Sequence, residues 1–125
     1  YVDTLDGKVI KDFIENIYAP YYDKFKGRIC GFFTDEPQIS RNGIPWSFIL
    51  PEEYKKAFGD DLIPHLPELF ADKGDYKTTR IRFWRLITDL FSKNFMKPYQ
   101  ILFRNIIIKT CLILQKRRMK TDILS

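Results

Sequence analysis

Two adjacent acids, Asp35 and Glu36, are the residues in this sequence best placed to do chemistry. They follow the apolar run Ile29–Phe33, which is typical of a buried strand, and a proline comes directly after them. Buried carboxylates are costly unless they bind something, so a site at the end of this strand is one reading. Because neighbouring side chains of a strand point to opposite faces, the two acids cannot form one acid–base pair. The other reading is structural, with the acids capping the next segment or pairing with Arg28 or Arg41.

Trp46 and His65 are the other candidate residues. Trp46 lies in a proline-containing loop and could stack against a sugar or another flat ligand, whereas many loop tryptophans only anchor the loop. His65 is the only histidine, and no cysteine or acid lies at metal-ligand spacing from it, so we interpret it as structural. The sequence has no Gly-rich phosphate loop, no Gly-x-Ser-x-Gly elbow and no Cys/His nucleophile pair. We predict no metal and no cofactor.

Charge limits the kinds of partner that we expect for this chain, and cysteine content limits its cellular compartment. Residues 1–96 contain 14 Lys/Arg against 15 Asp/Glu, whereas residues 97–125 contain 7 against 1. The net charge of +5 therefore belongs to the tail, and we expect no nucleic-acid partner for the body. Cys30 and Cys111 are too far apart in sequence to suggest a metal or disulfide framework, and they predict reduced thiols in a cytoplasmic protein.

Hydrophobic periodicity and capping residues predict the elements that position these side chains. We expect a helix over 6–25 with Asp6 as N-cap, a strand over 29–34, a short helix over 50–58 closed by Gly59, another within 60–70, and a long helix over 77–97. Pro20 should divide the first helix near Ala19, and Pro98 should end the last one. The first helix carries an apolar residue at every fourth position: Val9, Phe13, Ile17, Tyr21 and Phe25, flanked by Ile10, Ile14, Tyr18 and Tyr22.

The ends of the chain differ from its body. Residues 101–114 are densely apolar but include Arg104 and Lys109, and they are shorter than the roughly 20 apolar residues of a bilayer span, so we expect no membrane association. The first residues form neither an initiator methionine nor a secretory leader, and we expect the chain to be cut from something longer. We divide it into a body, residues 1–99, and an atypical tail, residues 100–125.

An ordered set of short motifs runs through the first 99 residues. They are Phe33-Thr34-Asp35-Glu36-Pro37, Pro45-Trp46, Leu50-Pro51-Glu52-Glu53-Tyr54-Lys55-Lys56, Asp61-Leu62 and His65-Leu66-Pro67-Glu68-Leu69-Phe70, with Tyr1–Asp6 before them and Asn94–Pro98 after them. Together they resemble the central region of bacterial glycoside hydrolases of the α-L-rhamnosidase-like type, whose catalytic domain is a (β/α)8 barrel. Beyond Tyr99 the sequence departs from that pattern, through either a frameshift or a replacement segment.

The resemblance implies an α/β fold: a predominantly helical fragment of a (β/α)8 barrel with one to three short parallel strands. It makes Glu36 the catalytic general acid or sugar-binding carboxylate, Asp35 its support and Trp46 a substrate-binding residue. Glycoside cleavage needs two carboxylates, and a barrel needs about 250 residues, so we expect a fragment that is inactive alone. Carbohydrate is the implied ligand, and exposed strand edges predict a homo-oligomer. The alternative is a non-catalytic helical interaction module that binds a partner through apolar residues of its tail.

Overall fold

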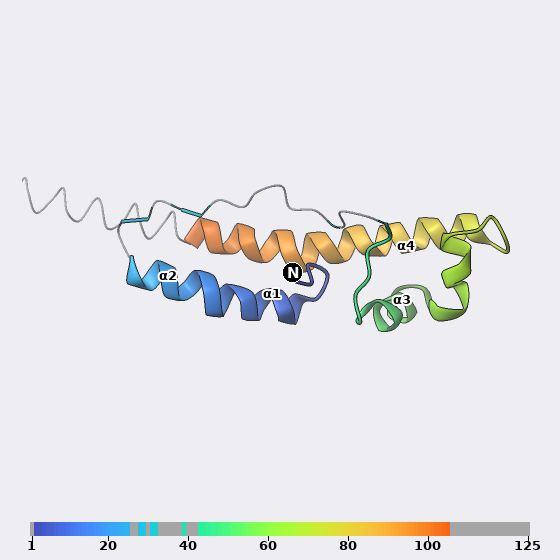
Figure 1. Ribbon diagram of the computed structural model, residues 1–125, viewed down its shortest axis with the longest axis horizontal. Coiled ribbons are helices and arrows are strands. Elements are labelled where there is room, and N and C mark those ends of the chain that lie inside the picture. Colours follow the sequence, from blue (N-terminus) through green and yellow to red (C-terminus); the bar gives the residue numbers. More distant parts are fainter. Residues whose placement is uncertain (1, 26–27, 30, 33–38, 40–42, 106–125) are drawn as a thin grey trace, which may run out of the picture.

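A computed structural model shows helices packed along both halves of one long helix (Figure 1). The structure describes residues 2–25, 28–29, 31–32, 39 and 43–105. In chain order the elements are α1 (Gly7–Phe13), the π-helical turn η1 (Ile14–Tyr18), α2 (Ala19–Lys24), α3 (Leu50–Phe58), the 3₁₀ helix η2 (Ile63–Leu69), α4 (Tyr76–Phe91) and the π-helical turn η3 (Ser92–Met96). Residues 97–105 continue the helix beyond η3.

The expected α/β fold with parallel strands is wrong. No strand occurs in the described ranges, and within the expected strand Ile29, Gly31 and Phe32 have no regular secondary structure. The other residues of 29–34 lie outside the described part of the chain. A short apolar run predicts burial but does not specify what buries it, and here the ring of Phe32 packs edge-on against Tyr18, 4.9 Å between centroids. The described chain is all-α, and a barrel fragment is not its architecture.

The helices with strong local signals form as expected. The carboxylate of Asp6 accepts a hydrogen bond from the backbone N–H of Lys8 at 2.8 Å and caps α1. Proline in the first turn of α3 costs no hydrogen bond, and the first-turn acids Glu52 and Glu53 favour the helix N-terminus. Gly59 ends α3 with a φ of 71°, a left-handed conformation that glycine adopts without strain.

Pro20 and Pro98 share one local arrangement. The helix that contains Pro20 is unbroken from Gly7 to Lys24, and only its type changes at Ala19, where we expected a kink or a division. Pro98 likewise does not end the long helix, which continues through Tyr99 to residue 105. Each proline is the second residue after a wide π-helical turn, η1 or η3. The residue just before each proline donates its N–H to a carbonyl five residues back, Ala19 to Ile14 and Lys97 to Ser92. Because the backbone is wider there, the proline ring fits within the helix.

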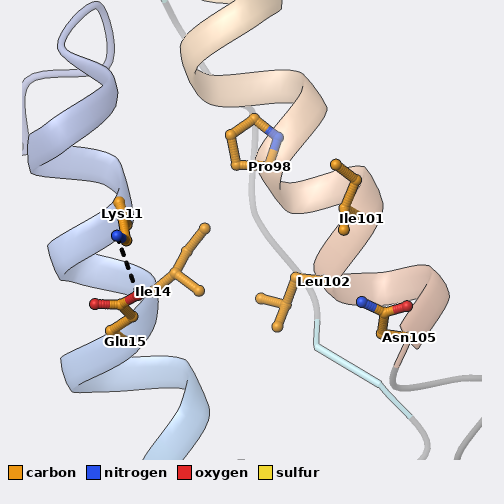
Figure 2. Close-up of a pocket in the computed structure, with 7 residues that line it drawn as sticks. All are labelled: Lys11, Ile14, Glu15, Pro98, Ile101, Leu102 and Asn105. Carbon is orange, nitrogen blue, oxygen red and sulfur yellow. Dashed lines mark ion pairs between the residues drawn. The ribbon is translucent and has the colours of Figure 1, made fainter.

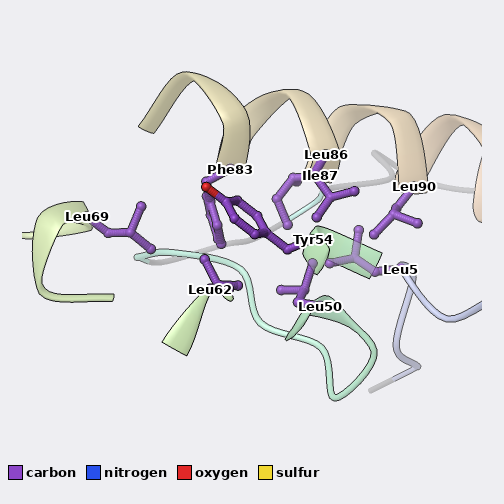
Figure 3. Close-up of a cluster of buried hydrophobic side chains, with 9 residues drawn as sticks. All are labelled: Leu5, Leu50, Tyr54, Leu62, Leu69, Phe83, Leu86, Ile87 and Leu90. Carbon is purple, nitrogen blue, oxygen red and sulfur yellow. The ribbon is translucent and has the colours of Figure 1, made fainter. Parts of the chain in front are cut away.

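The long helix divides its apolar side chains between two clusters. The α3 core is built on α4 by α3, η2 and the N-terminal segment (Figure 3): Leu5, Leu50, Tyr54, Leu62, Leu69, Phe83, Leu86, Ile87 and Leu90. The α1 core, Ile10, Phe95 and Tyr99, lies between α1 and the second half of the long helix. Phe91 packs against both clusters, and the side-chain amide of Asn94 donates to the carbonyl of Leu5 at 2.6 Å. The continuous helix thus joins the two cores.

Candidate functional site

Of the three site residues predicted from the sequence, the structure describes one. Asp35 and Glu36 lie outside the described residues. Trp46 is described and lies in the segment that leads into α3, with 45% of its surface exposed. Its predicted role in binding a ligand stays a prediction.

A braced turn displays Trp46 together with a second aromatic residue, Phe48. Between them Ser47 is buried, and its hydroxyl donates to the carboxylate of Asp3 at 2.7 Å. The backbone N–H of Leu50 closes the turn on the carbonyl of Ser47 at 3.1 Å. Phe48 is 93% exposed, although burial of a phenylalanine side chain stabilises a protein by roughly 1.5–3 kcal/mol. The turn therefore presents two aromatic side chains on a fixed backbone.

The helix formed by α1, η1 and α2 is apolar on two sides. The side that includes Ile10 and Tyr22 is buried. The other side carries the exposed row, which we define as Val9, Ile17, Tyr21 and Phe25, each between 36% and 56% exposed. Sequence periodicity identified both rows but did not decide which one faces the core. At the end of the exposed row the rings of Tyr21 and Phe25 stack, 6.4 Å apart.

An open apolar groove of about 340 Å³ lies between η1 and residues 97–105 (Figure 2). The side chains of Ile14 and Leu102 point toward each other across it. Its lining is Lys11, Ile14, Glu15, Pro98, Ile101, Leu102 and Asn105. The charged residues at its edge, Lys11 and Glu15, pair with each other at 3.8 Å. The groove therefore offers a ligand mainly apolar contacts.

A second hollow, of about 400 Å³, lies where α1 and α3 approach the long helix and is lined largely by charged residues. Lys56 forms ion pairs there with Glu52 at 2.8 Å and with Glu53 at 3.0 Å. These bonds raise the pKa of Lys56, and the Lys56 contact lowers the pKa of Glu52. Opposite charges thus satisfy one another, and the hollow has no strong bias toward an anion or a cation.

His65 lies in a charged cluster that the sequence reading missed. Its Nε2 is 3.3 Å from Oδ2 of Asp60, and its Nδ1 is 3.2 Å from Oε1 of Glu68. The other oxygen of Glu68 accepts a short hydrogen bond from the hydroxyl of Thr79. Glu68 stands three residues after His65, a spacing at which helical side chains meet, so part of this cluster was visible in the sequence. No three metal-ligating side chains in the described chain converge on one point.

Comparisons with known proteins add no assignment. Neither protein-family models, nor curated proteins, nor solved structures give a match to this chain. Within the ranges that the structure describes, no helix combines the length and apolarity needed to cross a bilayer. Function must therefore be argued from the exposed row, the aromatic turn and the charged cluster themselves.

Proposed function

We propose that the chain is a helical interaction module that associates with a second copy of itself through the exposed row. The observation that carries this proposal is that the helix of α1, η1 and α2 is apolar on two sides while the long helix covers only one. A helix that is apolar around most of its circumference is ordinarily buried. A contiguous apolar patch on a surface is typical of a protein–protein interface.

The shape of the exposed row favours a second copy as the occupant. A two-fold interface brings the same patch of both chains together, so the patch must be complementary to itself. Ile17 lies at the centre of the row, and antiparallel copies would place Ile17 beside Ile17 and Phe25 beside Val9. Phe13, which stands between Val9 and Ile17 in the sequence, packs against the α1 core. Residues of both charges, Lys8, Asp12, Asp23 and Lys24, lie near the row, so no block of one sign opposes the approach.

Ile17→Lys is expected to weaken this self-association at least about tenfold, equivalent to about 1.4 kcal/mol, because the interface would have to bury a charge. Sedimentation velocity over a concentration series measures the effect. The matched control is Ile81→Lys on α4, an isoleucine that is 69% exposed and lies outside the row. The wild-type chain and the control should dimerise with rising concentration. A wild-type chain that stays monomeric, or equal loss in both variants, would contradict the proposal.

Carbohydrate binding at Trp46 is the second candidate function, and the braced aromatic turn favours it. Flat apolar faces of sugars pack on exposed aromatic rings, and Ser47 and Asp3 hold the backbone beneath Trp46 and Phe48. In this hypothesis Glu36 is the general acid or sugar-binding carboxylate and Asp35 supports it, as the motif resemblance implies. A single catalytic carboxylate does not complete a glycoside hydrolase, so binding without turnover is the expected behaviour.

Trp46→Ala is expected to weaken sugar binding about tenfold or more, because it removes the stacking face. Isothermal titration with a panel of monosaccharides and oligosaccharides that includes rhamnose measures this. Trp84→Ala is the matched control, since Trp84 is also 45% exposed but lies on α4. Glu36→Gln tests the carboxylate in the same assay. Absence of binding by the wild-type chain, or the same loss in the Trp84 variant, would rule out a sugar site at this turn.

A further inference from the structure

The imidazole of His65 has a carboxylate at each ring nitrogen. Asp60 lies 3.3 Å from Nε2 and Glu68 lies 3.2 Å from Nδ1. A neutral imidazole carries one N–H and one lone pair, so it can donate to only one of the two acids. The protonated ring carries two N–H groups and can donate to both. The observed arrangement therefore fits the imidazolium and not the neutral ring.

The two carboxylates belong to different parts of the fold. Asp60 follows Gly59 in the turn after α3, and its Oδ2 is also 3.9 Å from Nη1 of Arg82 on α4. Glu68 lies on η2 and is fastened to the start of α4 by two bonds, one from the hydroxyl of Thr79 to its carboxylate and one from Nε of Arg80 to its backbone carbonyl at 3.0 Å. His65 thus links the turn after α3 to an η2 that is already tied to α4.

The other charged groups around this cluster offset the two acids at the ring only in part, through Arg82 beside Asp60. Arg80 pairs with Asp72 at 2.8 Å. Arg82 approaches Asp60 and bonds to the hydroxyl of Tyr54 on α3. Asp75, before α4, adds a further negative charge near Glu68. The acids that face the imidazole therefore favour its positive form.

We propose that His65 is a pH-operated latch, which fastens the turn after α3 to η2 when the ring is protonated and loosens that connection when the ring is neutral. On loss of the proton one of the two acids faces a lone pair, and that contact becomes repulsive. His65 and Glu68 lie between Leu62, which immediately precedes η2, and Leu69, its last residue, and both leucines are buried in the α3 core. Release of His65 therefore loosens the end of the α3 core that η2 covers.

The direction of the pH dependence follows from the same contacts. The hydrogen bond to Glu68, followed by the charge of Asp60, raises the pKa of His65 above its ordinary value despite some desolvation. The latch therefore contributes its full stability below about pH 6.5, the pKa of an unfolded histidine, and loses it as pH rises through the higher folded pKa.

Proton NMR tests the latch directly, because the only histidine gives a single imidazole Hε1 signal. We expect its titration midpoint to lie above about pH 6.5 and the amide signals of residues 60–69 to shift with the same midpoint. Asp60→Asn and Glu68→Gln should each lower that midpoint. Asp61→Asn is the matched control, since Asp61 pairs with Lys55 at 3.0 Å rather than with the ring, and it should leave the midpoint unchanged.

Amide hydrogen exchange tests the loosening itself. Protection factors in residues 62–69 should fall between about pH 5.5 and about pH 8.5 in the wild-type chain, and this fall should disappear in His65→Gln. A midpoint at or below about pH 6.5 would overturn the proposal, as would a midpoint that Asp60→Asn does not move. Amides of residues 60–69 that ignore the His65 titration would overturn it too. Asp60 is half exposed, so its variant keeps the test decisive if Glu68→Gln fails to fold.

Discussion

Phe83→Ala is expected to lower the free energy of unfolding by about 3–5 kcal/mol, one of the two largest effects that we predict for a single substitution in this chain. Phe83 is fully buried and packs from α4 into the α3 core. Truncation removes the transfer free energy of the ring and leaves a cavity in a cluster that joins α3, η2 and the N-terminal segment to α4, which limits how far the cavity can close.

Urea denaturation followed by circular dichroism measures this loss. Trp84→Ala is the control, because Trp84 is the next residue on the same helix, contacts the ring of Phe83 edge-on and is half exposed. We expect it to cost well under half as much as Phe83→Ala. Equal losses would show that burial in the α3 core does not determine the stability of the chain.

Tyr99→Ala is the second large prediction, with an expected loss of about 3–5 kcal/mol by analogy with other buried aromatic residues. Tyr99 is buried, and its ring lies 4.7 Å from that of Phe95, 5.9 Å from that of Phe103 and 5.4 Å from that of Tyr18. Burial, followed by a hydrogen bond with Tyr18, raises the pKa of the Tyr99 phenol well above its ordinary value. Tyr99→Phe keeps the ring and removes only the hydroxyl, so it should cost about 1 kcal/mol.

Hydrogen exchange distinguishes the two large substitutions by region. Tyr99→Ala should first reduce protection in α1 and η1, whereas Phe83→Ala should first reduce it in α3 and η2, because each side chain lies in a different core. Phe91 packs on both cores and gives them a direct physical connection. Uniform loss of protection along the chain in both variants would contradict this regional expectation.

Local chemistry explains which helices were predictable from the sequence. The cap at Asp6, the proline and acids at the start of α3, and the left-handed glycine at its end each act within a few residues, so they can be recognised without knowing the fold. Asp60 meets His65 only because the turn after α3 folds back toward η2. Sequence reading could suggest Glu68 as a partner, but it could not supply Asp60.

The predicted strand over 29–34 was wrong because strand formation depends on partners far away in the sequence. A strand exists only if other strands pair with it, and the apolar run that includes Ile29 and Phe32 carried no information about such partners. The motif resemblance suggested a barrel that would provide them, but the described chain provides helices. Of the predicted site, Trp46 is exposed on its loop as a ligand platform requires, and its ligand remains a prediction.

Pro98 shows where prediction from local sequence fails. A proline ordinarily ends or kinks a regular α-helix, but Pro98 follows η3, where the helix is already wide. The same short pattern occurs at both prolines, Asn16 to Tyr21 and Asn94 to Tyr99, each reading Asn, three residues, Pro, Tyr. This repeat was visible in the sequence and was the available signal that Pro98 would behave like Pro20.

The wide turns also set the rotational phase of the side chains along each helix. An α-helix advances about 100° per residue, so residues spaced by four drift around it and would spread over about 120° in twelve residues. A π-helical turn accommodates one extra residue, which offsets about 100° of that rotation. The residues at a spacing of four then spread over only about 20° around the helix. The aromatic row Phe91, Phe95, Tyr99 and Phe103 crosses η3, and the row from Ile10 to Tyr22 crosses η1. A spacing of four is thereby kept in line along both helices, and one residue more or fewer at either turn would rotate everything beyond it out of register.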